Sequence, residues 1–337
     1  MFSSPKRLGE RTNGYTVTPQ QYTRLAVAAL VALTGIVLTG AAVRLTGSGL
    51  GCPTWPKCYG NLYPPLQSHA VIEFANRVLS VPVVLFAGFA WLGALRRRPY
   101  RRDLMWLGSL LPLGVIAQAV LGGFTVKGAL DYGWVMGHFA LSMLILVAAV
   151  LLVWRATREP QQPPKRAGAP AAGVADRTLV LWSRTLVGLG ALTIFAGTAA
   201  TAAGPHAGGS PGQKINRLDF DGRGTMDFVI HRHAEIAFVF SVACVGLWWV
   251  ARRRGADERV QRPLSILCVL LALQGAVGLD QYETHLPAGL VWVHVGLAST
   301  AWIAVLWAAL ACGALQRRRA PSAAERVPES PLVAAPR

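Results

Sequence analysis

Charged residues are scarce in this sequence, and acidic ones are the scarcest. Asp and Glu account for 16 of the 337 residues, against 33 Lys and Arg. A chain that is 15% charged and 53% apolar does not have the composition of a soluble globular protein. The net charge of +17 would suit a nucleic-acid-binding protein. We expect no nucleic-acid partner, because membrane proteins concentrate Lys and Arg in loops on one side of the bilayer.

Long apolar runs dominate the rest of the chain. A helix needs about 20 apolar residues to cross the hydrocarbon core of a bilayer. The sequence therefore predicts an all-α polytopic membrane protein that contacts membrane lipid, with eight transmembrane helices. We place the spans near residues 24–43, 71–95, 104–124, 134–154, 178–202, 226–251, 264–280 and 288–314. The seventh run is short, and we expect it to be tilted or broken near its end.

The distribution of basic residues predicts the orientation. Both tails and every second loop are rich in arginine, as in the run Arg96–Arg97–Arg98–Pro99–Tyr100–Arg101–Arg102. The opposite loops hold only Arg44, Lys57, Lys127, Lys214, Arg217 and Arg223. By the positive-inside rule, the N- and C-termini are cytoplasmic and the opposite loops face outward.

One outward loop has an unusual composition. The stretch from Val43 to Gly60 reads VRLTGSGLGCPTWPKCYG, and no helix accommodates so many glycines and prolines. We expect an ordered loop. Cys52 and Cys58 would form a disulfide in an oxidising compartment, or would be thiols or metal ligands in the cytosol. The predicted orientation favours the disulfide.

The chain divides into two similar halves. We expect a cytoplasmic tail at 1–23, four-helix bundles at 24–155 and 178–314, a linker at 156–177 and a disordered tail at 315–337. Gln118 and His138 match Gln274 and His294, each 156 positions later, and Asn76–Arg77 matches His231–Arg232, 155 positions later. These offsets predict two pseudo-repeated four-helix bundles in the same orientation.

Histidines inside the spans are the candidate metal ligands. His138, His231 and His294 all lie near the outer ends of even-numbered spans. Two histidines on different helices of a bundle can hold a haem iron between them, and His231 with His294 forms such a pair. In the N-terminal half, His138 would lie opposite Asn76. The competing interpretation is that these are core histidines bonded to backbone carbonyls. We expect neither zinc nor copper, since further ligands are not evident.

Charged residues in the spans need partners as well. Arg77 and Arg232 would bind either a haem propionate or a carboxylate side chain. Glu73 lies one helical turn from Arg77, so it either pairs with this arginine or handles protons in the N-terminal pocket.

Several features together carry a family resemblance: the Val43–Gly60 stretch, the eight spans, Glu73, His138, His231–Arg232 and His294. Through these features, residues 24–314 resemble the haem A synthase family. The resemblance implies an enzyme that oxidises the C8 methyl of haem O to the formyl group of haem A, by successive hydroxylations with oxygen from water. It implies a haem b cofactor held by His231 and His294 in the C-terminal half. The N-terminal half would bind haem O, with Glu73 needed for activity and His138 as an iron ligand.

The same resemblance implies a bacterial plasma-membrane protein with a Cys52–Cys58 disulfide. Its partners would be the haem O-forming farnesyltransferase and cytochrome oxidase assembly, and the electron partner stays open. One residue departs from the family pattern: Asn76 stands where a histidine is expected, which would leave the N-terminal haem iron ligated by His138 alone, or with Asn76 orienting a water. The alternatives are a non-catalytic b-type cytochrome and a haem-binding oxidase assembly factor.

Overall fold

A computed structural model describes residues 15–158, 176–210, 212–220 and 224–314. Within these ranges the chain forms helices and no named strand. The C-terminal tail, and most of both the expected linker and the N-terminal tail, lie outside the described residues. The helices are α1 (Pro19–Leu45), α2 (Ser68–Arg96), α3 (Arg102–Lys127), α4 (Tyr132–Ala156), α5 (Arg177–Ala203), α6 (Thr225–Arg253), α7 (Glu258–Glu283) and α8 (Ala288–Ala311).

All eight helices are long and apolar enough to cross a bilayer, so the prediction of a multi-pass all-helical membrane protein is confirmed. The expectation of a short or broken seventh span is wrong, because α7 runs without interruption for 26 residues. Its proline, Pro263, lies inside the helix near its start and removes one backbone hydrogen bond there without ending the helix.

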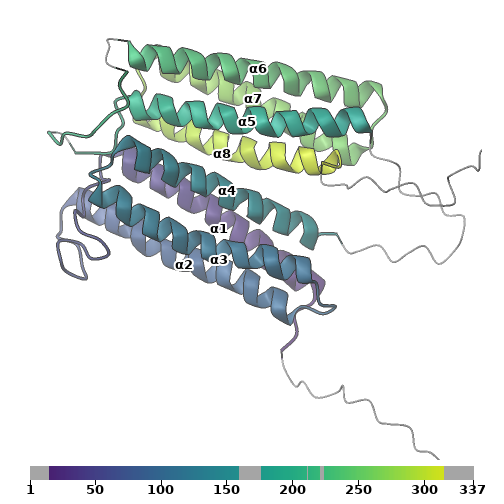
Figure 1. Ribbon diagram of the computed structural model, residues 1–337, viewed down its shortest axis with the longest axis horizontal. Helices are drawn as coiled ribbons and strands as arrows, with labels where there is room; N and C mark the ends of the chain where they lie inside the picture. The colour runs from purple at the N-terminus through teal and green to yellow at the C-terminus, as the bar shows by residue number, and fades with distance from the viewer. Residues whose placement is uncertain (1–14, 159–175, 211, 221–223, 315–337) are drawn as a thin grey trace, which may run out of the picture.

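The helices form two four-helix groups that lie side by side (Figure 1), α1–α4 in one and α5–α8 in the other. Corresponding helices have nearly equal lengths: 27 and 27 residues for α1 and α5, 29 and 29 for α2 and α6, 26 and 26 for α3 and α7, and 25 and 24 for α4 and α8. The equal lengths support the predicted repeat.

Small residues let the helices approach one another. Ala26 and Ala29 of α1 and Ala87, Ala90 and Ala94 of α2 are completely buried. In a bilayer, where lipid is as apolar as leucine, close backbone packing of this kind is a main source of helix association. Large apolar side chains such as those of Phe86, Phe89 and Leu113 point outward instead, as lipid-facing positions should.

The two halves contact each other through α1, α4, α5 and α8. The indole N–H groups of Trp292 and Trp302 on α8 donate to the carbonyls of Leu38 on α1 (2.9 Å) and Met143 on α4 (3.1 Å). Arg44 at the end of α1 donates to the carbonyls of His206 (2.8 Å) and Thr201 (3.1 Å) in the other half. These hydrogen bonds fix the relative position of the two bundles.

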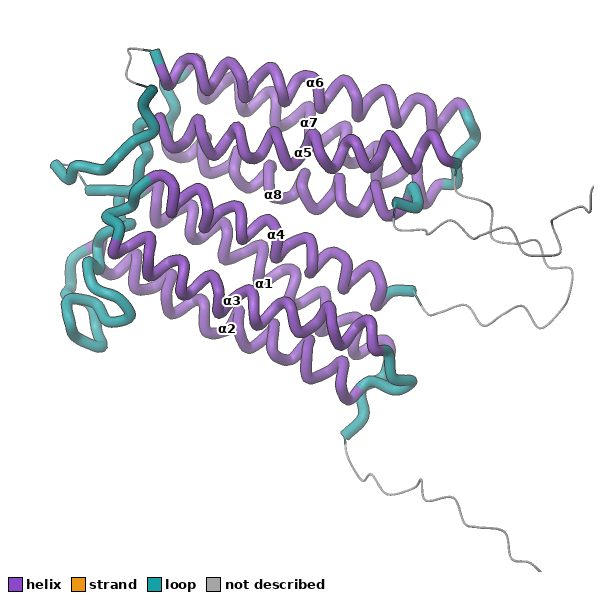
Figure 2. The backbone as a smooth tube through the Cα atoms, in the orientation of Figure 1, coloured by secondary structure: helices purple, strands orange, loops and turns teal. Residues whose placement is uncertain are grey.

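The connections at the two ends of the molecule differ (Figure 2). We call the end with the connections 46–67, 128–131, 204–224 and 284–287 the loop end; it lies at the left of Figures 1 and 2. The opposite, arginine end carries the connections 97–101 and 254–257. The Val43–Gly60 stretch and every histidine of the candidate site lie toward the loop end.

Candidate functional site

The connection between α1 and α2 is an ordered loop closed by a disulfide. Cys52 and Cys58 are bonded and fully buried, which confirms the predicted pairing. The loop lies against α2 and α3. Gly51 is so close to the backbone of His69 that a Cβ atom there would be 2.2 Å from the His69 carbonyl oxygen. Trp55 covers Gly123 of α3 in the same way, with ring atoms 2.9 Å from the position of a Cβ.

Arg77 holds this loop in place. Its guanidinium donates to the carbonyl oxygens of Cys52 (2.9 Å) and Thr54 (3.0 Å), and also reaches those of Pro56 and Lys57. The same group forms an ion pair with Glu73, one turn earlier on α2. Of the two partners expected for Arg77, the structure supplies the carboxylate side chain.

Glu73 is buried and completes this network. One carboxylate oxygen accepts the Cys52 backbone N–H at 2.7 Å, and the other accepts from Arg77. A buried carboxylate is stable only with partners of this kind. Glu73 therefore links the loop to α2, the helix that also carries Asn76. It does so through the hydrogen bond from the Cys52 backbone and through its ion pair with Arg77.

His138 of α4 lies in the N-terminal half beside α3. Its ring is close to Gly122, where a Cβ atom would be 3.4 Å from the His138 Cε1 atom. The Gln118 amide donates to the His138 carbonyl at 2.9 Å. The His138 Nδ1 atom is buried and has no hydrogen-bond partner among the described residues. An orphaned ring nitrogen in such a place is available to a ligand.

Asn76 lies on the helix face next to Glu73 and is bonded within the protein. The Thr39 hydroxyl of α1 donates to its Oδ1 atom at 2.7 Å. This hydrogen bond occupies the side-chain oxygen of Asn76. His138 is thus the single histidine of the sequence-predicted set in the N-terminal half.

In the C-terminal half, the structure brings His233 of α6 together with His294 of α8. Their ring centroids are 6.2 Å apart. The His233 Nδ1 atom donates to the Thr193 carbonyl at 3.0 Å, so its Nε2 atom is free. Gly197 and Gly278 make room for the two rings, since a Cβ atom would lie 3.0 Å and 3.2 Å, respectively, from their Cε1 atoms.

The structure thus places His233, and not the expected His231, beside His294. His231 is exposed, its Nδ1 atom donates to the Asp227 carbonyl at 2.6 Å, and its ring packs against Tyr282 of α7. The physical reason is helix geometry: residues two positions apart point to nearly opposite sides of a helix. Arg232 pairs with Glu235 at 2.7 Å on the exposed face, and so also has a carboxylate partner.

The helix bounds explain why sequence comparison missed His233. The range of α6 is that of α2 displaced by 157 positions at both ends, which makes His233 the equivalent of Asn76. The match of Asn76–Arg77 to His231–Arg232 implies a displacement of 155, which differs from the 157 of the helix bounds. On α1 and α5, displaced by 158, Thr39 corresponds to Gly197. Thr39, which contacts Asn76, and Gly197, which contacts His233, thus also occupy equivalent positions.

The His233–His294 pair fits a haem iron. An imidazole nitrogen lies about 2 Å from a bound metal, so two rings on opposite sides of one ion have centroids about 6 Å apart. The observed 6.2 Å agrees with this value. His294 Nδ1, like His138 Nδ1, is buried without a partner among the described residues. Those residues contain no cluster of three or more His, Cys, Asp and Glu side chains that would hold a different metal.

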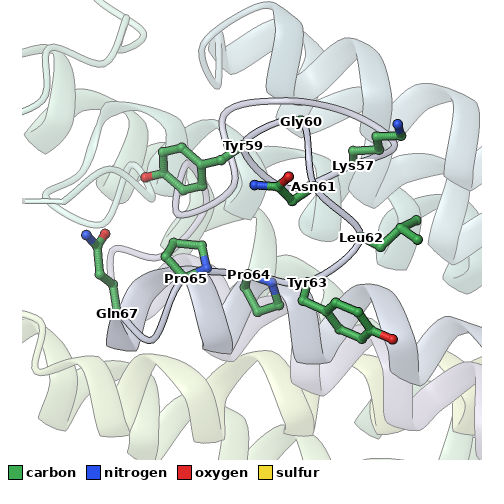
Figure 3. A pocket seen from close by; sticks show the side chains of 9 residues that line it. All are labelled: Lys57, Tyr59, Gly60, Asn61, Leu62, Tyr63, Pro64, Pro65 and Gln67. Carbon is green, nitrogen blue, oxygen red and sulfur yellow. The ribbon is translucent and has the colours of Figure 1, made fainter.

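An open pocket of about 820 Å³ lies at the surface of the second half of the disulfide loop (Figure 3). Tyr59, Tyr63, Pro64 and Gln67 are among the residues that line it. It contains none of Glu73, Asn76 and His138, so it is separate from the candidate site.

The fold and the site define a class: a multi-pass helical membrane protein, built as two similar four-helix bundles, with histidine sites near the loop end of each. Comparison with known families agrees. Residues 23–306 match the cytochrome oxidase assembly protein family, and the chain belongs to that family.

Several curated relatives are named heme A synthase. The protein of Shewanella oneidensis is 26% identical over 306 residues, which cover 78% of this chain and 88% of that protein. Those of Lysinibacillus sphaericus and Geobacillus kaustophilus are 37% and 33% identical, over alignments that cover 42% and 45% of their lengths.

Proposed function

We propose that this protein is a haem A synthase, an oxidoreductase that converts the C8 methyl of haem O to a formyl group for cytochrome oxidase biogenesis. The observation that carries the proposal is the pair of unequal histidine sites. The C-terminal half has two facing imidazoles, whereas the equivalent site of the N-terminal half has His138 and an asparagine. The family and the names of the relatives support the same activity.

The C-terminal site is suited to a permanently bound haem b. His233 and His294 would hold the iron, and Gly197 and Gly278 leave the space that the two rings occupy. Such a haem supplies one-electron redox chemistry when bound. Of the two kinds of partner expected for Arg77 and Arg232, a haem propionate or a carboxylate side chain, both arginines have the carboxylate, from Glu73 and Glu235 respectively.

The N-terminal site is suited to the substrate. His138 would ligate the iron of haem O from one side, and Asn76 would leave the other side open. Glu73 is the acid–base group of this pocket. Its carboxylate is held by the Cys52 N–H and by Arg77, at a position one turn from Asn76 on the same face of α2. The disulfide loop closes the loop end above Glu73, so it limits the access of bulk water to the pocket.

The positive-inside rule supports a location in the bacterial plasma membrane with both termini cytoplasmic, so that the loop end and both haem sites face outward. A disulfide in the loop agrees with an oxidising compartment on that side. A functional association with the farnesyltransferase that makes haem O would follow from the need to hand over an apolar substrate within the membrane.

The activity can be tested directly. Membranes containing the expressed protein are supplied with haem O, and the haems are extracted and identified by mass. Formation of the formyl haem is the expected result. Unchanged haem O together with a reducible b-type spectrum would contradict the proposal, and would favour the alternative of a non-catalytic cytochrome.

A further inference from the structure

The exposed face of α6 near the loop end carries charge where a lipid-facing helix should be apolar. Phe228, Val239 and Val242 are exposed along one stripe of this helix. Arg232 and Glu235 lie on the same stripe, with 55% of each side chain exposed. They are seven and ten residues inside α6, about 10 and 15 Å along its axis. Ionisable groups at such depth are costly in lipid and generally have a function.

The neighbouring residues add groups that can form hydrogen bonds. His231 is exposed, and since its Nδ1 atom donates to Asp227, its Nε2 atom faces outward. The Tyr282 ring packs edge-on against His231, and its hydroxyl has no hydrogen-bond partner among the described residues. We call the residues Phe228, His231, Arg232, Glu235 and Tyr282 the α6–α7 polar face.

The N-terminal half provides an internal comparison, because its equivalent face is different. The displacements of 157 for α2 and α6, and 156 for α3 and α7, place Phe74, Ala75, Val78 and Val126 at the positions of His231, Arg232, Glu235 and Tyr282. These four residues are apolar. Phe74 is also covered by the disulfide loop, where it packs against Cys52 and Cys58. The polar face is thus a specific feature of the C-terminal half.

We propose that the α6–α7 polar face binds the head group of a lipid-soluble quinone, which accepts the electrons and protons released by the oxidation of haem O. Converting a methyl to a formyl group with oxygen from water releases four electrons and four protons. One haem O and one water with two quinones therefore give one haem A and two quinols. The inference rests on the proposed function for the direction of electron flow, but not for the binding.

Three features favour this ligand. The face lies at membrane depth, so a ligand must arrive through the lipid. Arg232 is already neutralised by Glu235, and Asp227 lies nearby, so the face suits uncharged carbonyls better than a phosphate. The Tyr282 hydroxyl can donate to one quinone carbonyl, and the exposed Nε2 atom of His231 can form a hydrogen bond with the same head group. His233 lies two residues from His231 on the other side of α6, a helix only about 10 Å across.

The test uses the full-length protein in lipid nanodiscs without haem O. A short-chain azidoquinone is photoactivated, and the labelled peptides are identified by mass spectrometry. We expect labelling of α6 and α7, reduced at least tenfold in the double variant His231→Phe/Tyr282→Phe. The Phe238→Leu variant, which changes an exposed apolar residue of α6 outside the polar face, should label like the unchanged protein.

Equal labelling of α2 and α3, or labelling that the double variant does not reduce, would overturn the proposal. So would exclusion of the label from this face by a second copy of the chain, detected as cross-linking between α6 helices. The binding result is independent of the reaction: specific labelling without haem A formation would refute the proposed function and leave the quinone site standing. Haem A formation without labelling would refute the quinone site and leave the proposed function standing.

Discussion

The N-terminal half places Asn76 and Thr39 where the C-terminal half places His233 and Gly197. In the N-terminal half, the Thr39 hydroxyl donates a hydrogen bond to the Asn76 side-chain oxygen at 2.7 Å. In the C-terminal half, Gly197 has no side chain and so leaves space for the His233 ring. The third and fourth helices carry the same residues in both halves, with Gln118, Gly122 and His138 repeated as Gln274, Gly278 and His294. The two halves thus differ at the candidate ligand positions through residues on the first two helices of each half.

The residues around the two candidate haem sites also differ between the halves. The N-terminal half adds a buried carboxylate, Glu73, and a disulfide loop that holds it. At the position equivalent to Glu73 the C-terminal half has Ile230, and its free cysteines Cys244, Cys268 and Cys312 form no disulfide. The difference supports the proposal that acid–base chemistry takes place in the N-terminal half and that the cofactor is bound in the C-terminal half.

The largest effect is expected from Glu73→Gln. The amide keeps the shape of the side chain but loses the charge, and with it the proton-handling group of the N-terminal pocket. Haem A formation should fall by more than a hundredfold, which is about 3 kcal/mol of transition-state stabilisation. Haem b content, measured by absorbance, should not change. Equal loss of both readings would show that Glu73 serves the fold instead of the reaction.

Asn76→His should make the N-terminal site resemble the C-terminal one, provided that space is made for the ring. Thr39 contacts Asn76 directly, so the single variant should bind the second haem poorly. The double variant Asn76→His/Thr39→Gly should show a second bis-imidazole signal by electron paramagnetic resonance, with turnover reduced about tenfold or more because the open iron side is lost. If the single and double variants gave the same spectrum, the equivalence of Thr39 and Gly197 would be wrong.

Removing the disulfide should have a smaller effect, confined to the N-terminal half. Cross-links that close short loops contribute about 2–3 kcal/mol, and the Cys52→Ser/Cys58→Ser variant would also loosen the carbonyls that Arg77 binds. We expect a lower thermal unfolding temperature and reduced haem O oxidation, with the haem b spectrum preserved. Replacement of the C-terminal Cys312 by serine is the matched control, and should leave haem O oxidation unaffected.

The smallest expected effect is on stability, and it comes from the residues that cap the N-termini of α1 and α5. Thr18 caps α1 with a neutral side chain, whereas Asp176 caps α5 and forms an ion pair with Arg254. The hydrogen bond from Arg254 lowers the pKa of the Asp176 carboxyl below its usual value. The stabilisation is therefore present at neutral pH and is lost as the pH falls through this lowered pKa.

Asp176→Asn keeps the cap but removes the ion pair. Its unfolding temperature should be slightly below that of the unchanged protein at pH 7, and the difference should vanish in acid. A difference that persisted in acid would assign the effect to the cap instead of the ion pair.

Much of this structure could be predicted from the sequence. The spans follow from apolar length alone, and the disulfide from two cysteines in a loop opposite the arginine-rich side. The seventh span was misjudged because Pro263 and the polar residues at both ends hide the full length of α7. The choice between His231 and His233 depends on which face of α6 points inward, and a dipeptide match between repeats does not carry that information.

Glu73 could be predicted as a partner of Arg77 from their spacing, but the other contacts of this arginine could not. Arg77 binds backbone carbonyls of a loop that is distant in sequence, and no spacing rule predicts such contacts. Comparing whole helices between the halves would have found the displacement of 157, and with it both His233 and Gly197.

The most direct test of the division between the halves is haem retention in protein purified from cells that make no haem O. We expect one bis-imidazole haem b, lost in His233→Ala and kept in both His231→Ala and His138→Ala. Loss of this haem in His231→Ala with retention in His233→Ala would contradict the ligand assignment. Its loss in His138→Ala alone would reverse the roles of the two halves.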